Sequence, residues 1–367
     1  MAKKNTSSSS TVRKPTKRLG LLDEFIRAQQ VISGLTTSMP MILMTKEVVE
    51  EFQDVAKVDP VMDSLKNDLQ RALRAIKRPE DYTQMAQAYE IYAETSTYLD
   101  LSRRGVALQR TPGTGQHGQK RPDFLHKHPS GDIYVEVKAL EIEDYLTRHD
   151  EIAQEALKIL AELDARARKP GVHFGHPQVL SGHKFTSKAV DRIDEIARRI
   201  KNVIKPEQIK FGPTILVVDL GRLGTAPFGP SALLPVFFHD APPAESCVSG
   251  ELWQIALGMP GEQIFHLPQF DGKSNLGGHQ SEAGVLREYT SLMAITFRCP
   301  RWSEPAELLT IWNGGWDQTG LANPCALEEH QIEEFLYNYS DGLNDQSNEG
   351  GWDYRVNPLR PRPPRQR

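Results

Sequence analysis

The sequence predicts an α/β protein with a mixed central sheet flanked by helices and preceded by a helical N-terminal extension. Residues 19–78 repeat apolar side chains at helical spacing, which predicts the extension. Residues 120–140 place strand-forming residues on both sides of a turn-forming tetrapeptide, which predicts a β-hairpin. Residues 214–220 form a continuous apolar run, as expected of a buried central strand.

The composition is that of a globular protein without a membrane segment. The chain has 367 residues, 39% hydrophobic and 25% charged, enough for one large or two ordinary domains. No apolar run reaches membrane-spanning length, and no signal peptide is visible. Cys247, Cys299 and Cys325 are widely spaced, as in reduced cytosolic proteins. We therefore expect a cytoplasmic protein, whose net charge of −4 argues only weakly against a nucleic-acid partner.

Both ends of the chain are basic and are predicted to be disordered, over residues 1–18 and 341–367. Residues 1–18 carry six lysines and arginines, no acidic residue and a serine run. Residues 358–367 are rich in proline and arginine. Two interpretations stay open, because such tails either contact a phosphate backbone or only increase solubility.

The helix expected at about 80–104 carries a candidate functional carboxylate. Glu94 lies in an apolar stripe at helical spacing, where a carboxylate is costly unless it meets a metal or a hydrogen-bond donor. A rival apolar stripe exists on this helix, and Glu94 is exposed if that face packs inward. Glu90, one turn earlier, is a substitute candidate. The two stripes are Ile91, Glu94, Tyr98 and Leu101, and Met85, Tyr89, Tyr92, Ser96 and Leu99.

The predicted hairpin brings charged side chains together. Glu136 and Lys138 share one face of the second strand because side chains alternate along a strand. If His128 pairs with Ile133 across the turn, Asp123 falls opposite Lys138 and diagonal to Glu136. Two carboxylates and an ammonium then converge, which is the side-chain set of a metal site.

The segments Pro122-Asp123 and Glu136-Val137-Lys138 resemble the paired motif of the PD-(D/E)XK nuclease superfamily, which has a restriction-endonuclease-like core. The resemblance covers about residues 82–220. It implies a core over residues 79–340 with an insertion at about 221–289. The superfamily usually has a glutamate on the helix before its first core strand, and Glu94 is the natural candidate.

The resemblance implies Mg²⁺-dependent hydrolysis of a nucleic-acid phosphodiester, with Mn²⁺ as a substitute and DNA rather than RNA as the substrate. Asp123, Glu136 and the carbonyl of Val137 would then bind the metal. Lys138 would position the attacking water or stabilise negative charge, and Glu94 would orient the water or hold a second ion. Lys184 and Lys188, at the start of the helix after the hairpin, would contact nucleic acid, and a homodimer is compatible with this class.

Two other functions compete with the nuclease. One is a catalytically inactive nucleic-acid-binding protein on the same fold, although a structural relic has no reason to keep two clustered carboxylates. The other is a helical interaction scaffold built on residues 19–78. A zinc site in the loop of His173, His176 and His183 is a weaker candidate, because no cysteine or carboxylate motif joins these residues.

The remaining elements complete the expected sheet and its cover. The first core strand is expected at 106–108, and residues 292–297 and 307–312 are expected to form a closing hairpin. Helices are expected at 151–168, 187–204 and 328–337.

Overall fold

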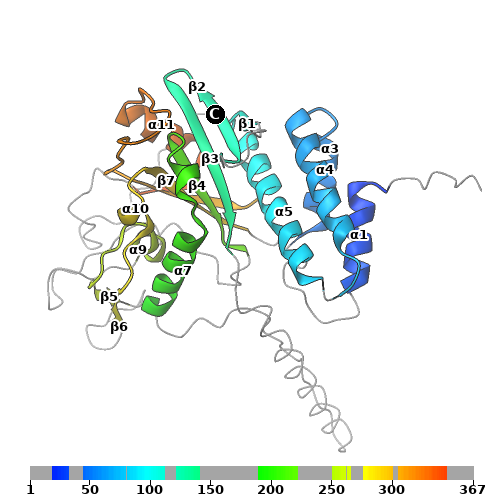
Figure 1. The fold of residues 1–367 in the computed structure, drawn as a ribbon, viewed down its shortest axis with the longest axis horizontal. Helices are drawn as coiled ribbons and strands as arrows, with labels where there is room; N and C mark the ends of the chain where they lie inside the picture. Colours follow the sequence, from blue (N-terminus) through cyan, green and yellow to red (C-terminus); the bar gives the residue numbers. More distant parts are fainter. Residues whose placement is uncertain are drawn as a thin grey trace, which may run out of the picture.

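The computed structural model describes residues 19–32, 44–79, 81–111, 121–140, 189–221, 250–261, 263–265, 276–300 and 305–344. Within them, a mixed sheet is flanked by helices (Figure 1), which confirms the predicted α/β class. Several predicted features lie outside the described residues: the basic tail 1–18, the helix 151–168, Lys184, Lys188, Cys247, and the histidines His173, His176 and His183. No helix in the described part of the chain is long and apolar enough to cross a membrane.

The main sheet has seven strands in the order β1-β2-β3-β4-β7-β8-β9. Strands β3, β4 and β7 run parallel and form its centre, while β1–β2–β3 and β7–β8 are antiparallel and β9 pairs parallel with β8. A separate two-stranded sheet joins β5 and β6. The strands are β1 Leu108–Arg110, β2 Phe124–His128, β3 Gly131–Ala139, β4 Thr214–Asp219, β5 Gln263–Phe265, β6 Leu276–His279, β7 Leu292–Cys299, β8 Glu307–Trp312 and β9 Gly342–Leu343.

The helices form two groups, one on the N-terminal side of the hairpin and one after it (Figure 1). The first group is α1 Leu21–Ile32, α3 Lys46–Val55, α4 Pro60–Ala75 and α5 Tyr82–Arg103. The second is α7 Ala189–Val203, α8 Pro206–Ile209, α9 Glu251–Leu257, α10 Val285–Glu288 and α11 Glu329–Tyr339. Helix α4 begins where the sequence predicts, because the Asp59 side chain accepts from the backbone N–H groups of Val61 and Met62 and Pro60 occupies the first turn.

Helix α5 is the central helix of the molecule. It packs against α4 on one side and against β3 on the other. Both apolar stripes that the sequence offered are therefore largely buried, one through Tyr98 and Leu101 and the other through Tyr89 and Tyr92. The two alternatives for the inward face were not exclusive, because a helix covered on two sides is apolar nearly all round.

The two faces of the sheet cover different cores. Val135 and Val137 of β3 belong to a hydrophobic cluster that includes α1, α3, α4 and α5. Leu216 and Val218 of β4 belong to a second cluster with α7 and α9. Glu136 is the register partner of Leu216, so Glu136 and Lys138 lie on the α7 side of the sheet.

The hairpin register differs from the expected one by two residues. His128 pairs with Gly131, not with Ile133, so the turn contains only Pro129 and Ser130. Gly131 adopts φ 142°, which a residue with a side chain rarely adopts, and a Cβ at this position would collide with Cys325. The Ala326 N–H also donates to the Ser130 carbonyl at 3.1 Å, so the later segment fixes the tight turn.

Three further boundaries need correction. Strand β1 begins two residues after the predicted start at residue 106. The expected β7–β8 hairpin is present, but β8 is not the edge of the sheet, because Gly342–Leu343 adds strand β9. The start of a disordered tail at residue 341 was therefore placed too early. The division of the chain into a helical region, a core and an insertion stays a prediction.

A buried ionic network fixes α5 to the carboxyl ends of the central strands. Arg298 of β7 donates to Asp100 of α5 at 2.9 Å and to Asp219 of β4 at 2.5 Å. The Tyr89 hydroxyl donates to the other oxygen of Asp219 at 2.9 Å. The network holds the helix that carries Glu94 against the sheet.

Candidate metal and active site

The hairpin places the two motif carboxylates side by side. Phe124 pairs with Val135, so the same register places Asp123, just before β2, opposite Glu136. The Val137 N–H donates to Oδ2 of Asp123 at 2.8 Å. Asp123 was expected opposite Lys138 and instead lies opposite the second carboxylate, which brings the two candidate metal ligands closer together than the sequence suggested.

The backbone of Val137 also faces this pair. The N–H groups of Tyr134 and Leu140 donate to the β4 side, to the carbonyls of Pro213 and Asp219. Backbone groups alternate sides along a strand, so those of Val137 point the other way, towards Asp123. The last pair between β2 and β3 is Phe124 with Val135, so no β2 residue pairs with Val137. The Val137 carbonyl is therefore on the side of β3 where Asp123 lies.

Glu136 is the most deeply buried member of the site, with 1% of its surface exposed. Its Oε1 accepts from the Lys138 ammonium. Its Oε2 is buried and has no hydrogen-bond partner among the described residues. A buried carboxylate oxygen without a donor is unfavourable, so this atom is suited to a ligand that carries positive charge.

Glu94 joins the site and Glu90 does not. Glu94 is half-buried, and Asp123 and Glu136 both act on its charge, whereas Glu90 is exposed on the helix surface. Of the two candidates that the sequence offers, Glu94 is therefore the one whose charge interacts with those of Asp123 and Glu136.

Arg110 is a neighbour of the site that the sequence did not single out. It is the last residue of β1 and the register partner of Phe124, next to Asp123. Its guanidinium donates to Ser64 Oγ at 2.8 Å and to Asp68 Oδ2 at 2.6 Å, both on α4. Arg110 lowers the pKa of both Glu94 and Asp123. The predicted first strand, 106–108, ended before Arg110. A strand placed at 108–110 would have revealed Arg110, because its pairing with β2 brings that residue to the site.

Burial, followed by the mutual repulsion of the carboxylates, dominates the electrostatics of the site. Burial, and next the Asp123 charge, raise the pKa of Glu94 to about 8 and that of Glu136 to about 7. Burial also raises the pKa of Asp123. Burial lowers the pKa of Lys138, but Glu136 and the other two carboxylates outweigh it and the net shift is upward. Lys138 therefore remains a cation at neutral pH in the metal-free protein.

The metal-free protein is expected to lose stability as the pH rises from about 4.5 to about 8. In this range the folded state holds protons on Glu94 and Glu136 that the unfolded chain has released, because both folded pKa values exceed the ordinary glutamate value of 4.5. Each pKa unit is worth about 1.4 kcal/mol, and the two shifts together set an upper limit of about 8 kcal/mol on the loss. Urea unfolding in a chelator across this range measures it.

A double variant with Gln at positions 94 and 136 is the control, and its stability should vary much less with pH. A wild-type stability that rises over the same range would contradict the predicted direction.

Other polar and aromatic candidates have structural roles. The His126 ring stacks on Phe335 with centroids 5.0 Å apart, and its Nδ1 lies 2.9 Å from the Ala107 carbonyl. Trp312 is buried in the core, and the Trp316 indole donates to the Ser291 carbonyl at 3.1 Å. None of these side chains is grouped with Asp123 and Glu136.

The donor set fits a hard divalent cation that keeps several waters. Among the described residues, no group of three or more His, Cys, Asp and Glu side chains is placed to hold a metal ion, so a cation here would depend on two carboxylates, backbone and water. Asp123, Glu136 and the Val137 carbonyl offer oxygen ligands, and the orphaned Oε2 of Glu136 has no other partner. Mg²⁺ is bound in this way, through one or two carboxylates together with water and substrate phosphate.

Comparison with known proteins gives no relative. No protein-family model, curated protein or solved structure matches this chain.

Proposed function

We propose that this protein is a divalent-metal-dependent nuclease with a restriction-endonuclease-like core, and that it hydrolyses phosphodiester bonds of DNA. One observation carries the proposal: Asp123 and Glu136 lie opposite each other, and no described residue donates a hydrogen bond to the buried Oε2 of Glu136, while Lys138 donates to its Oε1. The chain order of α5, a three-stranded antiparallel unit, α7 and the parallel strand β4 supports it.

Asp123, Glu136 and the Val137 carbonyl would hold the cation, which is Mg²⁺ by ligand chemistry, with Mn²⁺ as a substitute. When bound, such an ion supplies Lewis acidity and a water of lowered pKa. The sheet holds the two carboxylates in place, because Asp123 directly precedes β2, Glu136 lies within β3, and the adjacent Phe124, Val135 and Val137 are core residues.

Lys138 supplies a fixed positive charge next to the carboxylates. Its ammonium is held by Glu136 and is three-quarters or more buried, so it is oriented before substrate arrives. A preorganised cation of this kind stabilises the negative charge that develops on a phosphoryl group during hydrolysis.

Glu94 orients the attacking water or holds a second ion. In the metal-free protein its pKa of about 8 keeps it largely protonated at neutral pH. A carboxyl group with a pKa near the working pH exchanges protons efficiently with a bound water. Arg110 favours its ionised form and so adjusts that pKa downward.

Purified wild type is expected to cleave at least one member of a DNA panel (supercoiled, linear, single-stranded and branched) when Mg²⁺ or Mn²⁺ is present. Asp123→Ala should remove this activity, because it deletes a ligand that no neighbouring carboxylate replaces. Glu90→Ala, on the exposed side of α5, is the matched control and should cleave like wild type.

Equal cleavage by wild type and Asp123→Ala would indicate a contaminating nuclease and would remove Asp123 from the site. DNA binding without cleavage by wild type on every substrate would instead favour an inactive nucleic-acid-binding protein on this fold.

A further inference from the structure

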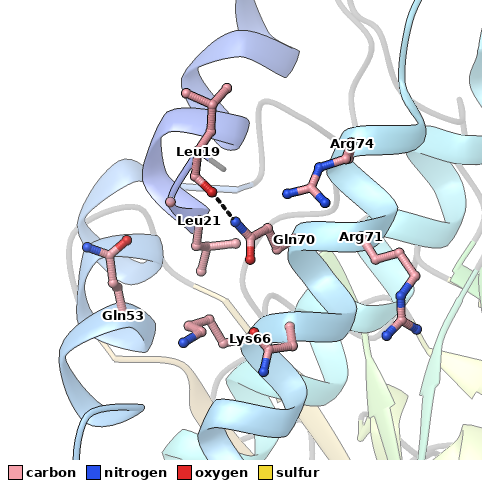
Figure 2. A pocket seen from close by; sticks show the side chains of 9 residues that line it. Leu19, Leu21, Gln53, Lys66, Gln70, Arg71 and Arg74 are labelled. Carbon is pink, nitrogen blue, oxygen red and sulfur yellow. Dashed lines mark hydrogen bonds between the residues drawn. The ribbon is translucent and has the colours of Figure 1, made fainter. Parts of the chain in front are cut away.

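A basic recess lies on the N-terminal helices, outside the carboxylate site. It has a volume of about 720 Å³ and is formed by the start of α1, by α3 and by α4 (Figure 2). Its polar lining is three cations and three amides, with no carboxylate: Lys66, Arg71, Arg74, Gln53, Asn67 and Gln70. A recess lined in this way is suited to an anion.

The polar lining of α4 is arranged in two rows along the helix. Lys66, Gln70 and Arg74 are spaced four residues apart, and Asn67 and Arg71 form the neighbouring row. Lys66 and Arg74 are separated by roughly 12 Å of helical rise, which several consecutive phosphates of one nucleic-acid strand would cover. The recess therefore presents a line of donors and not a single point.

The cations around α4 outnumber their carboxylate partners. Asp63 pairs with Lys66 alone. Glu24 is shared by Arg27 and Arg74, and Asp68 is shared by Arg71 and Arg110. Five cations thus share three carboxylates, because Arg27 and Arg110, which lie outside the recess lining, compete with the recess arginines for Glu24 and Asp68.

The recess arginines keep donors available. Among the described residues, Arg74 donates only through Nε, to Glu24. Arg71 is 78% exposed at its side chain and has only the Asp68 ion pair at 3.2 Å. An arginine has five N–H donors, so each retains donors for a phosphate.

One carboxylate connects the recess to the candidate site. Asp68 contacts Arg71 of the recess and also Arg110, whose charge acts on Asp123 and Glu94. A strand that leaves the site along α4 would therefore meet the recess. Leu19 at the recess is also the residue that follows the basic segment 1–18 in the sequence.

We propose that this recess binds the sugar–phosphate backbone of the nucleic-acid substrate beside the segment that is cut. The inference rests on the proposed function and adds the surface that holds the substrate. The recess contributes affinity without reading base sequence, because phosphate contacts position a nucleic acid but do not identify bases.

The test compares the binding of labelled duplex DNA, in a chelator that keeps it intact, by the full-length wild type and two triple variants. The recess variant is Lys66→Gln, Arg71→Gln and Arg74→Gln. The control variant is Lys46→Gln, Lys57→Gln and Arg78→Gln, three ion-paired cations of the same helical region outside the recess. The control pairs are largely exposed and contribute little stability. In the recess variant the buried Glu24 keeps its pair with Arg27, and urea unfolding of both variants verifies that they fold.

The recess variant should bind about tenfold or more weakly near 0.1 M salt, and its slope of log affinity against log salt should fall by about 2–3. The control variant should bind like wild type. Equal weakening in both variants, or none in the recess variant, would overturn the proposal. A third result would also overturn the proposal: low millimolar inorganic phosphate displaces DNA from wild type, and the recess variant shows no change in its salt slope. That result would identify the recess as a site for a small anion.

The cleavage assay separates this inference from the proposed function. If wild type cleaves DNA in an Asp123-dependent manner and the recess variant binds normally, only the recess inference fails. If no substrate is cleaved and the recess variant still loses DNA binding, the nuclease proposal fails and the phosphate-binding surface stands.

Discussion

Glu136→Gln is expected to abolish metal-dependent cleavage and, at the same time, to stabilise the metal-free protein at pH 8. The amide keeps the size of the side chain but lacks the charge that binds a cation. Loss of several kcal/mol of transition-state stabilisation corresponds to a rate decrease of about 10³-fold or more. Cleavage of the substrate found with wild type measures this effect.

The stability gain follows from the raised pKa. Burial, and next the Asp123 charge, raise the pKa of the Glu136 carboxyl to about 7 in the folded state from the ordinary value of 4.5 in the unfolded chain, so its ionisation at pH 8 opposes folding. Gln is neutral at every pH and removes that opposition, while the loss of the Lys138 pair reduces the benefit. A net gain of about 1–2 kcal/mol is expected at pH 8, and almost none near pH 5, where Glu136 is protonated in the folded protein.

Glu90→Gln is the control, because this exposed side chain is outside the site, and neither cleavage nor stability should change. A large loss of stability in Glu136→Gln at pH 8 would mean that Glu136 serves mainly as the structural partner of Lys138. That result would contradict the metal-ligand role, since functional sites are expected to reduce stability and not to supply it.

The clustering of Asp123, Glu136 and Lys138 could be predicted because it depends on a short hairpin. The predicted register was wrong by two residues, since the contact of Gly131 with the distant Cys325 tightens the turn. A two-residue shift leaves every side chain on its own face of the strand, whereas a one-residue shift would have moved them all. The face of each residue was therefore correct although the pairing was not.

The environment of Glu94 could not be settled from periodicity. Helix α5 is buried on two sides, so no polar stripe marks an exposed face. Arg110 was missed for a different reason. Its partners Ser64 and Asp68 lie more than 40 residues earlier in the chain, and local sequence patterns do not predict contacts between such distant residues.

Long-range pairing also explains the missed strand. Gly342–Leu343 is too short to show strand periodicity and is a strand only because β8 offers it a partner. Asp341 supports this pairing: Arg104 of the α5 end donates to its Oδ2 at 2.6 Å, and so does the Leu308 N–H at 2.8 Å.

Arg298→Met is expected to lower the free energy of unfolding by about 3–5 kcal/mol, the typical effect of breaking a buried ion pair. Asp219 is fully buried and Asp100 nearly so, and both would lose the guanidinium that neutralises them. Burial lowers the pKa of Arg298, but Asp100 and Asp219 outweigh it and raise the pKa, which shows how strongly the pairs hold the charge. Urea unfolding measures the loss, with Arg71→Met, an exposed pair, as the control expected to change stability by less than about 1 kcal/mol.

A triple variant identifies the cause of that loss. Adding Asp100→Asn and Asp219→Asn to Arg298→Met removes the unpaired charges and should recover much of the stability, because neutral amides are less costly to bury than carboxylates. If Arg298→Met costs less than about 1 kcal/mol, or if the triple variant is no more stable than the single one, the network does not act through buried charge. Arg298→Met should also reduce cleavage, since α5 carries Glu94 six residues before Asp100 and the network fixes that helix to β4 and β7.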